Sequence, residues 1–366
     1  MRIISIETIP VQIPLKSAFK TSKAEQKSAK IVLVKLHTDK GIIGVGECDP
    51  RPHITGETVN SVTTIISDSL GPALCGMNLS ESDDIAKICS QMDRMIVSNP
   101  SAKAGIDIAL YDALGKKKGV PVHALLGEEQ TTSLISCGFS DLGSEGGAER
   151  EASKCRELGG TSFKIKVGGD WTIDARRVAI VRSTLDAKTD LIIDPNQAWS
   201  VDQSILILNE NERIIAACEQ PIEWNDLIGL STVTERVDVP IVADEAVQSP
   251  FDASVVLRLA AADMVNIKHL KSGGLYHACE IARLLQRNGL HCMIGSTMES
   301  GVSSAASVHL GVTCPNLKYF DVAPPTDFLV EDITEGLEWD GLNVEPPDQP
   351  GLGITLRDDL VRKYAF

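Results

Sequence analysis

The sequence predicts an α/β fold, a (β/α)8-type barrel with an N-terminal α+β capping domain. From about residue 130 onward, eight short apolar runs recur roughly every 25 residues, each followed by a polar loop and a helical stretch. The preceding segment has strand-like alternation first and helical periodicity afterwards. The 366 residues of the chain suffice for one barrel of roughly 200–250 residues and a smaller companion domain.

Residues 1–125 are expected to form the capping domain. Residues 1–50 alternate apolar and polar side chains as a β-meander does, with a tight turn at residues 39–41. Over residues 102–118, apolar side chains recur every three or four positions, which predicts a helix that ends at Gly119. This half of the chain is therefore predicted to be α+β.

Residues 126–325 are expected to form the barrel and to carry the catalytic site. The predicted strands, in order, are TSLISCGF, SFKIKVG, DLIIDPN, IAACEQP, VPIVADE, DMVNIKH, LHCMIGS and LKYFDVA. A doubly wound open sheet is the alternative architecture, but it would require a Gly-rich phosphate loop after the first strand, and none is present. Residues 326–366 do not continue the repeat, and we expect them to return to the capping domain.

Composition argues against several classes of function. A net charge of −15 without a basic run disfavours nucleic acids and anionic membranes as partners. No apolar stretch is long enough to span a bilayer, and the first residues lack the pattern of a signal peptide. The nine cysteines include no CxxC pair and are typical of reduced core residues. We therefore expect a cytoplasmic protein that acts on a small molecule, and we also expect a homo-oligomer.

Charged side chains mark the ends of five consecutive runs in the barrel segment. Because all strands of a parallel barrel point the same way, these side chains are expected to converge on one mouth, where barrel active sites are built. In chain order they are Lys164 with Lys166, Asp194, Glu219, Asp244 and Lys268.

The three carboxylates of this set indicate a magnesium site. Asp194, Glu219 and Asp244 offer oxygen ligands, and neither His nor Cys occupies a matching position. Oxygen donors suit a hard cation with octahedral coordination, for which Mg²⁺ is the default and zinc a poor candidate. A single such carboxylate is more often a solvated loop residue or a salt-bridge partner. Three of them in step with the strand period favour the metal.

The lysines indicate a type of reaction. Lys164 and Lys166 lie two residues apart, so they share one face of a strand, and the apolar residues between and beside them face the helices. Lys268 faces the same cavity from the opposite side. A divalent cation that holds a substrate carboxylate stabilises the enediolate formed when the neighbouring carbon loses its proton. One lysine can remove that proton and the other can return it to the opposite face.

A lysine accepts a proton only when it is neutral. The ordinary lysine pKa lies near 10.4, so we expect the pKa of the base to be lowered by burial and by nearby positive charge, here the metal and Lys164.

The motifs at these positions resemble those of the enolase superfamily, and within it the muconate-lactonizing subgroup. The resemblance implies Asp194, Glu219 and Asp244 as Mg²⁺ ligands, Lys166 and Lys268 as the acid/base pair, and Lys164 as the residue that steadies the substrate carboxylate. It also implies that Asn196 orients the metal site, although a strand-end turn explains an asparagine there equally well. The motifs are KIK at 164–166, DPNQAW at 194–199, EQP at 219–221, ADE at 243–245, NIKHLKSGG at 266–274 and GSTMESG at 295–301, together with GVGECDP and QPGLGI near the two ends.

Within the subgroup the chain is most similar to dipeptide epimerases of the L-Ala-D/L-Glu type, through HITGET at 53–58, the loop near residue 20 and FDVAPP at the eighth strand. The resemblance implies 1,1-proton transfer on a small carboxylate, a dipeptide or an amino-acid derivative. Dipeptide epimerases carry a second aspartate two residues after the first on strand eight, and the pair binds the dipeptide ammonium. Here Asp321 is present, but Ala323 takes the second position. A racemase of N-acylated amino acids and a muconate-cycloisomerase-like enzyme are therefore alternatives.

Substrate specificity is expected to come from the capping loops and from the barrel mouth. For Lys23 or His53 alone, a solvated loop residue is the more ordinary explanation. The candidates are Thr21, Lys23, Arg51 and His53 in the loops, and Ser296, Met298 and Asp321 at the mouth.

Two other functions fit a barrel. A glycosidase would use two carboxylates across a cleft, for which Glu219 and Glu299 are available. The chain has few aromatic residues for sugar stacking, and that mechanism leaves the lysines unexplained. A barrel that only binds or regulates is the second alternative, but every expected metal and lysine position is filled.

Overall fold

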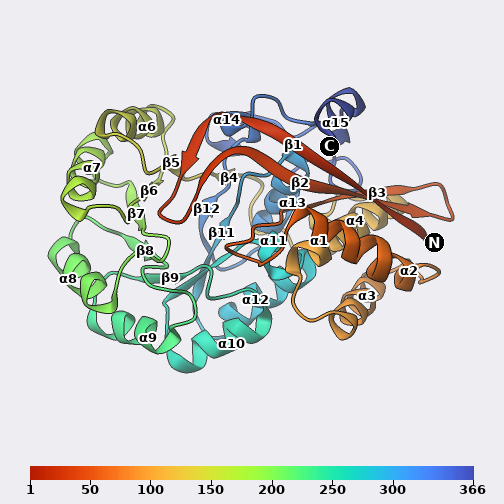
Figure 1. The fold of residues 1–366 in the computed structure, drawn as a ribbon, viewed down its shortest axis with the longest axis horizontal. Helices are drawn as coiled ribbons and strands as arrows, with labels where there is room; N and C mark the ends of the chain where they lie inside the picture. Colours follow the sequence, from red (N-terminus) through yellow and green to blue (C-terminus); the bar gives the residue numbers. More distant parts are fainter.

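Eight parallel strands form the barrel of the computed structural model, which describes residues 1–366 (Figure 1). The strands neighbour one another in chain order, and the Cys137 amide donates to the Phe320 carbonyl at 2.7 Å, which brings the first strand against the last. Each of the eight predicted runs contains or overlaps one barrel strand, so the predicted barrel is confirmed. The strands are β5 (Gly138–Ser140), β6 (Ser162–Lys166), β7 (Asp190–Asp194), β8 (Ala217–Glu219), β9 (Ile241–Ala243), β10 (Met264–Ile267), β11 (His291–Gly295) and β12 (Leu317–Asp321).

Helices connect successive barrel strands. Six of them begin at a Ser or Asp whose side chain accepts a hydrogen bond from a backbone amide of the first turn, which fixes where the loop ends. The short α14 takes the place of a full eighth helix. The helices are α6 (Glu145–Glu157), α7 (Trp171–Thr184), α8 (Val201–Asn211), α9 (Leu227–Arg236), α10 (Pro250–Leu259), α11 (His269–Ser272), α12 (Leu275–Arg287), α13 (Gly301–Val312) and α14 (Pro325–Phe328).

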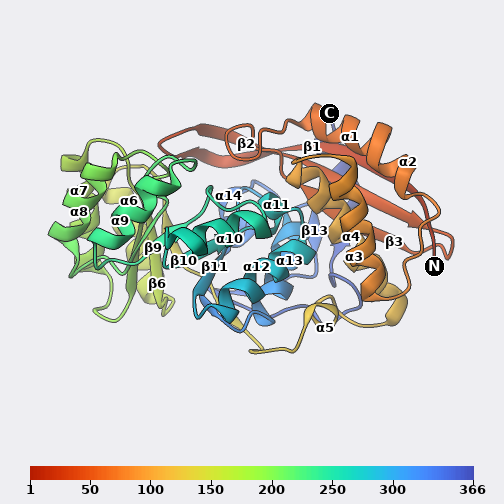
Figure 2. The same cartoon turned by 90° about the horizontal axis from the view of Figure 1, so that it is seen from below.

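An antiparallel sheet and a group of helices precede the barrel. The sheet order β1-β2-β3 confirms the predicted meander, and Gly119, with φ of 70°, ends the predicted helix α4. Figure 2 shows the long hairpin of β1 and β2 running across one end of the barrel. The elements are β1 (Ile3–Lys20), β2 (Glu25–Thr38), β3 (Ile43–Cys48), α1 (Val59–Ile65), the π-helix η1 (Ile66–Leu70), α2 (Gly71–Leu74), α3 (Ser82–Met95), α4 (Pro100–Lys118) and α5 (His123–Leu126).

Close packing of α4 on β3 explains the glycines of the GVGEC segment. A Cβ atom on Gly46 would lie 1.9 Å from the Gly105 carbonyl oxygen, which no real structure tolerates. Glycine at this position therefore lets the helix backbone approach the strand and brings Glu47, the next residue, to the boundary with the barrel.

The last forty residues cross back over both parts of the molecule. Strand β4 (Leu134–Ile135), just before the barrel, pairs with β15 (Asn343–Val344), which in turn pairs with β14 (Trp339–Asp340). Strands β13 (Thr334–Glu335) and β16 (Thr355–Leu356) form a second small pair. Helix α15 (Asp358–Tyr364) then lies against β1, where Ala365 and Val11 form a bridge.

Hydrophobic side chains fill the space between the barrel strands and their helices, and this core continues into the capping domain. Eight of the nine cysteines are buried, and all nine are free thiols. None of the helices combines the length and hydropathy that a membrane crossing requires.

Candidate active site

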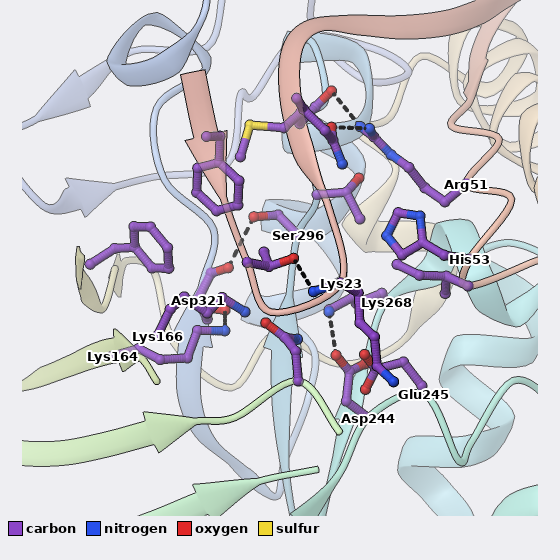
Figure 3. Close-up of a pocket in the computed structure, with 18 of the residues that line it drawn as sticks. Lys23, Arg51, His53, Lys164, Lys166, Asp244, Glu245, Lys268, Ser296 and Asp321 are labelled. Atoms are coloured by element: carbon purple, nitrogen blue, oxygen red, sulfur yellow. Dashed lines mark hydrogen bonds and ion pairs between the residues drawn. The ribbon is translucent and has the colours of Figure 1, made fainter. Parts of the chain in front are cut away.

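A pocket of about 820 Å³ lies at the carboxyl ends of the barrel strands, beneath the tip of the β1–β2 hairpin (Figure 3). The tip is attached to the barrel loops. The Ser22 hydroxyl lies 3.0 Å from the Pro195 carbonyl oxygen, and the Lys23 ammonium lies 2.6 Å from Glu223. Both domains therefore contribute to the pocket, as predicted from the sequence.

Lysines and carboxylates alternate around this mouth. Lys164 donates to Glu219 at 3.0 Å and also to Asp321. Lys166, on the same strand, donates to Asp194. All five side chains are buried. The lysines of β6 therefore point into the barrel, as predicted, and the structure brings them together with two of the three predicted metal ligands.

Lys268 lies on the opposite side of the pocket. It follows β10, four strands from β6 in the sheet order, and its ammonium donates to Asp244 Oδ2 at 2.5 Å. In Figure 3, Lys164 and Lys166 lie on one side of the cavity and Lys268, Asp244 and Glu245 on the other. A substrate between them would present one face to each lysine.

Three polar residues of this layer were not anticipated from the sequence. Asn266 donates to Glu219 at 2.7 Å, Gln220 accepts from the Asp244 amide at 2.9 Å, and Lys271 donates to the Asp244 carbonyl at 2.7 Å. These contacts hold the carboxylates in place. The signal for Asn266 was available, because it precedes Lys268 by two residues and therefore shares the interior face.

The turns after β7 and β8 have unusual backbone geometry. Asn196, Gln197 and Gln220 have φ angles of 45°, 67° and 34°, in the left-handed region that non-glycine residues seldom occupy. The Asn196 amide also donates to Asp194 Oδ1 at 2.8 Å. Strain of this kind is concentrated where a fixed arrangement of side chains is needed, and here it fixes the residues beside two of the carboxylates.

Electrostatics at the mouth differ from the expectation for a lysine base. Burial acts to lower the pKa of Lys268, but the charges of Asp244 and Glu219 outweigh it and raise the pKa above its usual value. At Lys164, too, burial acts to lower the pKa, but the charges of Asp321 and Glu219 outweigh it and hold the pKa well above its usual range. The expected lowering of the lysine pKa is therefore not found in this arrangement, in which the carboxylates face ammonium groups. Neutralisation of those carboxylates by a cation would remove the cause of the raised values.

The side chains fit a hard cation, although they do not form a ready-made cluster. No three Asp, Glu, His or Cys side chains are arranged around a common metal position, because an ammonium group lies against each predicted ligand. Two pocket-lining residues nevertheless carry a buried oxygen that accepts no hydrogen bond, Asn196 Oδ1 and Glu245 Oε2, and Asp244 Oδ1 faces only the Lys271 ammonium, at 3.4 Å. Oxygen ligands of this kind are the ones that Mg²⁺ prefers.

The predicted specificity residues lie around the rim of the pocket. The Ser296 hydroxyl donates to the Asp321 carbonyl at 3.0 Å, and the Met298 carbonyl accepts from Arg51 at 3.3 Å. Thr21 and exposed His53 also line the pocket. All seven predicted specificity residues are therefore brought to one cavity: Thr21, Lys23, Arg51, His53, Ser296, Met298 and Asp321.

The glycosidase alternative is not supported by this geometry. Glu299 does not line the pocket, and its buried carboxyl accepts from Thr297 and Ser304 at the start of α13. Glu219 is held by Lys164 and Asn266. The two carboxyl groups therefore do not flank a cleft.

Models of two domain families match the chain. The N-terminal domain of mandelate racemase and muconate lactonizing enzyme matches residues 3–127, and the enolase C-terminal domain-like model matches residues 147–360. The chain belongs to the enolase superfamily. This assignment agrees with the predicted resemblance and with the position of the pocket at the barrel mouth.

Relatives in the superfamily have different activities. An L-Ala-D/L-Glu epimerase of Clostridium acetobutylicum is 35% identical, with 94% of this chain and 96% of the relative covered. An N-succinyl-L-Arg/Lys racemase of Bacillus cereus is 31% identical, with 100% of this chain and 98% of the relative covered. Muconate cycloisomerase 1 of Rhodococcus opacus is 30% identical, with 100% of this chain and 99% of the relative covered.

A solved structure is also similar. The dipeptide epimerase of Enterococcus faecalis, in complex with Mg and L-Leu-L-Tyr, superposes with a TM-score of 0.91 at 31% identity, and covers 97% of this chain and 100% of its own. Relatives that epimerise, racemise and cycloisomerise thus share this fold at comparable identity.

Proposed function

We propose that the protein is a Mg²⁺-dependent epimerase or racemase that transfers a proton at the carbon next to a substrate carboxylate. The supporting observation is the pair of buried lysines, Lys166 and Lys268, on opposite sides of one pocket. Asp244 lines that pocket beside Lys268, and Asp194 and Glu219 lie directly behind its lining, against Lys166 and Lys164. A planar enediolate between the lysines exposes one face to each of them. That arrangement serves inversion at a single carbon.

The chain's own residues have separate tasks in this mechanism. Asp194, Glu219 and Asp244 would hold Mg²⁺, which supplies electrophilic stabilisation of the substrate carboxylate when it is bound. Lys166 or Lys268, once neutral, takes the α-proton, and the other lysine, protonated, delivers a proton to the opposite face. Lys164 holds the substrate carboxylate through its ammonium group. In the reverse direction the two acid/base lysines exchange roles.

Metal binding and activation of the base are linked in this proposal. Asp244 and Glu219 keep Lys268 protonated in the described arrangement. When both carboxylates bind a divalent cation, their negative charge no longer stabilises the ammonium, and burial then favours the neutral amine. The protein would thus generate its base only when the metal is present.

For the substrate, a specific observation supports an N-acylated amino acid as the second candidate beside a dipeptide. Asp321 is engaged by Lys164, and Ala323 offers no carboxylate. Phe19 and Phe139, stacked with centroids 5.5 Å apart, and Phe328 line the same part of the pocket. A free ammonium group would find there only an aspartate that Lys164 already holds, whereas a neutral acyl group needs no charge partner and would lose little on desolvation against the aromatic rings.

A screen for α-proton exchange in D₂O tests the proposal. Purified protein with Mg²⁺ would be incubated with dipeptides, N-acylated amino acids and muconate, and deuterium uptake would be followed by mass spectrometry. We expect one mass unit of deuterium at the α-carbon of a dipeptide or N-acyl amino acid, with appearance of the other stereoisomer. Conversion of muconate alone would favour the cycloisomerase alternative. Binding of carboxylates without exchange would favour a non-catalytic barrel.

A further inference from the structure

A buried carboxyl group of the capping domain holds a wall of the pocket. Glu47, in β3, has no exposed surface and accepts a hydrogen bond from the Ser300 amide at 3.1 Å, while its second oxygen contacts the Ser300 hydroxyl. Ser300 is the N-cap of α13. Residues 296–298 of the same loop line the pocket. Glu47 therefore connects one domain directly to a pocket-forming loop of the other.

A second contact joins the same two segments. The Arg51 guanidinium donates to the Met298 carbonyl at 3.3 Å and is itself held by Asp49, at 2.8 Å. Residues 47–51 thus contact the loop at its end, through Glu47, and in its middle, through Arg51. These two contacts attach Met298 and Ser300, and with them the pocket-lining loop, to the capping domain.

We propose that Glu47 is a positioning residue that fixes residues 296–300 against the capping domain, and that it does so as a protonated carboxyl group. The function of that loop in substrate binding rests on the proposed function of the pocket. The contacts that Glu47 makes are independent of it.

The surroundings of Glu47 favour the protonated form. The titratable side chains facing it are Glu299 in the loop, Asp332 in the C-terminal segment and Asp49 in its own strand extension. Arg51 is paired with Asp49, and no cation forms an ion pair with Glu47 or Glu299. Burial raises the pKa of Glu47 to about 8 and raises that of Glu299 well above its usual value.

A protonated carboxyl group matches the partner that it meets. One carboxyl oxygen accepts from the Ser300 amide and the other lies against the Ser300 hydroxyl, whose oxygen accepts from the Val302 amide at 3.2 Å, so a protonated carboxyl group can donate to that oxygen. A glutamine side chain offers the same acceptor and donor. Glu47→Gln should therefore preserve the contact at every pH, whereas Glu47→Ala should remove it.

Hydrogen–deuterium exchange of the full-length protein tests this inference without any substrate. In Glu47→Ala, amides of residues 297–301 should exchange about tenfold faster, because one hydrogen bond of about 1.4 kcal/mol is lost. Glu47→Gln should retain wild-type protection. Raising the pH from about 7 to about 9.5 should increase exchange, corrected for the intrinsic rate, in the wild type but not in Glu47→Gln, because ionised Glu47 would be buried beside Asp49 and Asp332 without a cation partner.

Asp332→Ala is the matched control. Asp332 accepts from the Gly301 amide at 3.1 Å, so it caps the same helix, but it comes from the C-terminal segment and does not line the pocket. In this variant the Gly301 amide should exchange faster, whereas the amides of residues 297–298 should exchange as in the wild type. For any substrate found by the exchange screen, Glu47→Ala should raise KM more than it lowers kcat, and Glu47→Gln should restore KM.

Three results would overturn the inference. One is wild-type protection of the loop in Glu47→Ala. Another is exchange in Glu47→Gln as fast as in Glu47→Ala, and the third is an equal pH response in Glu47→Gln and the wild type. Because exchange is measured without substrate, a failure of the proposed enzymatic activity would leave all three outcomes readable.

Discussion

The barrel interior contains two layers of opposite character, contributed by the same strands. At the mouth, Asp194, Glu219 and Asp244 are buried among lysines. Two residues earlier on each strand, and on the same face, the side chains belong to an apolar cluster. The members of this floor are Cys137, Ile192, Ala217, Val242, Met264, Met293 and Tyr319. The apolar layer thus lies about 7 Å along the strands from the layer of charged side chains.

The difference shows what each layer requires. The floor is stabilised by apolar burial and needs only complementary shape. The mouth buries charges, which is costly unless each is paired, and each of Asp194, Glu219 and Asp244 lies against at least one lysine ammonium. That cost is accepted where the charges serve binding or catalysis. Substitutions in the mouth should therefore affect activity most strongly, and those in the floor should affect stability.

Metal removal should give the largest effect in the mouth. Dialysis against a chelator should reduce α-proton exchange to background, because the charge that stabilises the enediolate is lost and Lys268 stays protonated. Addition of Mg²⁺ should restore the exchange rate measured by mass spectrometry. Full activity in the chelated protein would refute the metal site and with it the proposed mechanism.

Replacing either acid/base lysine should come next. Lys166→Ala and Lys268→Ala should each lower the rate of stereoinversion by about 10²–10⁴-fold, the range typical of a positioned acid or base. Each variant can still exchange the α-proton of one stereoisomer, because the remaining lysine faces one side of the carbon. Polarimetry would follow inversion, and deuterium uptake would follow exchange. Wild-type inversion in both variants would contradict the assignment.

A cavity in the floor should reduce stability while sparing chemistry. Ile192→Ala should lower the free energy of unfolding by about 2–5 kcal/mol, as for other buried aliphatic truncations, because Ile192 is fully buried two residues from Asp194. Denaturant titration would measure the loss. Ile228→Ala, at a side chain with 67% exposure, is the control and should change stability by less than about 0.5 kcal/mol. Similar losses in both variants would show that the floor is not a distinct core.

Restoring a carboxylate at the rim should have the smallest effect. Ala323→Asp should raise kcat/KM for dipeptides with a free ammonium relative to N-acylated analogues by about tenfold, or about 1.4 kcal/mol. The new carboxylate would provide the charge partner that Asp321, held by Lys164, does not offer alone. Ala323→Asn is the neutral control of similar size. An unchanged ratio in Ala323→Asp would mean that the substrate amine does not lie beside this residue.

Much of this arrangement could be predicted from the sequence because it follows from periodicity. Eight evenly spaced apolar runs predicted the barrel, and charges at the ends of those runs predicted a shared mouth, since parallel strands place their carboxyl ends together. The two-residue spacing of Lys164 and Lys166 predicted that both point inward. None of these predictions depends on how loops fold.

Other features depended on contacts between segments far apart in the chain. The pairing of Lys164 with Asp321 joins residues 157 positions apart. Only this contact shows that a lysine already binds the aspartate at the rim of the pocket. The raised pKa of Lys268 reflects the combined charges of Asp244 and Glu219, which come from two different strands.

The sequence by itself determined the fold class, the set of charged residues at the mouth and the side on which they meet, because strand period and direction are local properties. Only the tertiary structure decided which carboxylate each lysine contacts, that Glu299 lies outside the pocket and that Glu47 reaches across to Ser300. The physical reason is that burial and charge pairing are set by neighbours in space, and such neighbours can lie far apart in the chain, as Glu47 and Ser300 do at 253 positions.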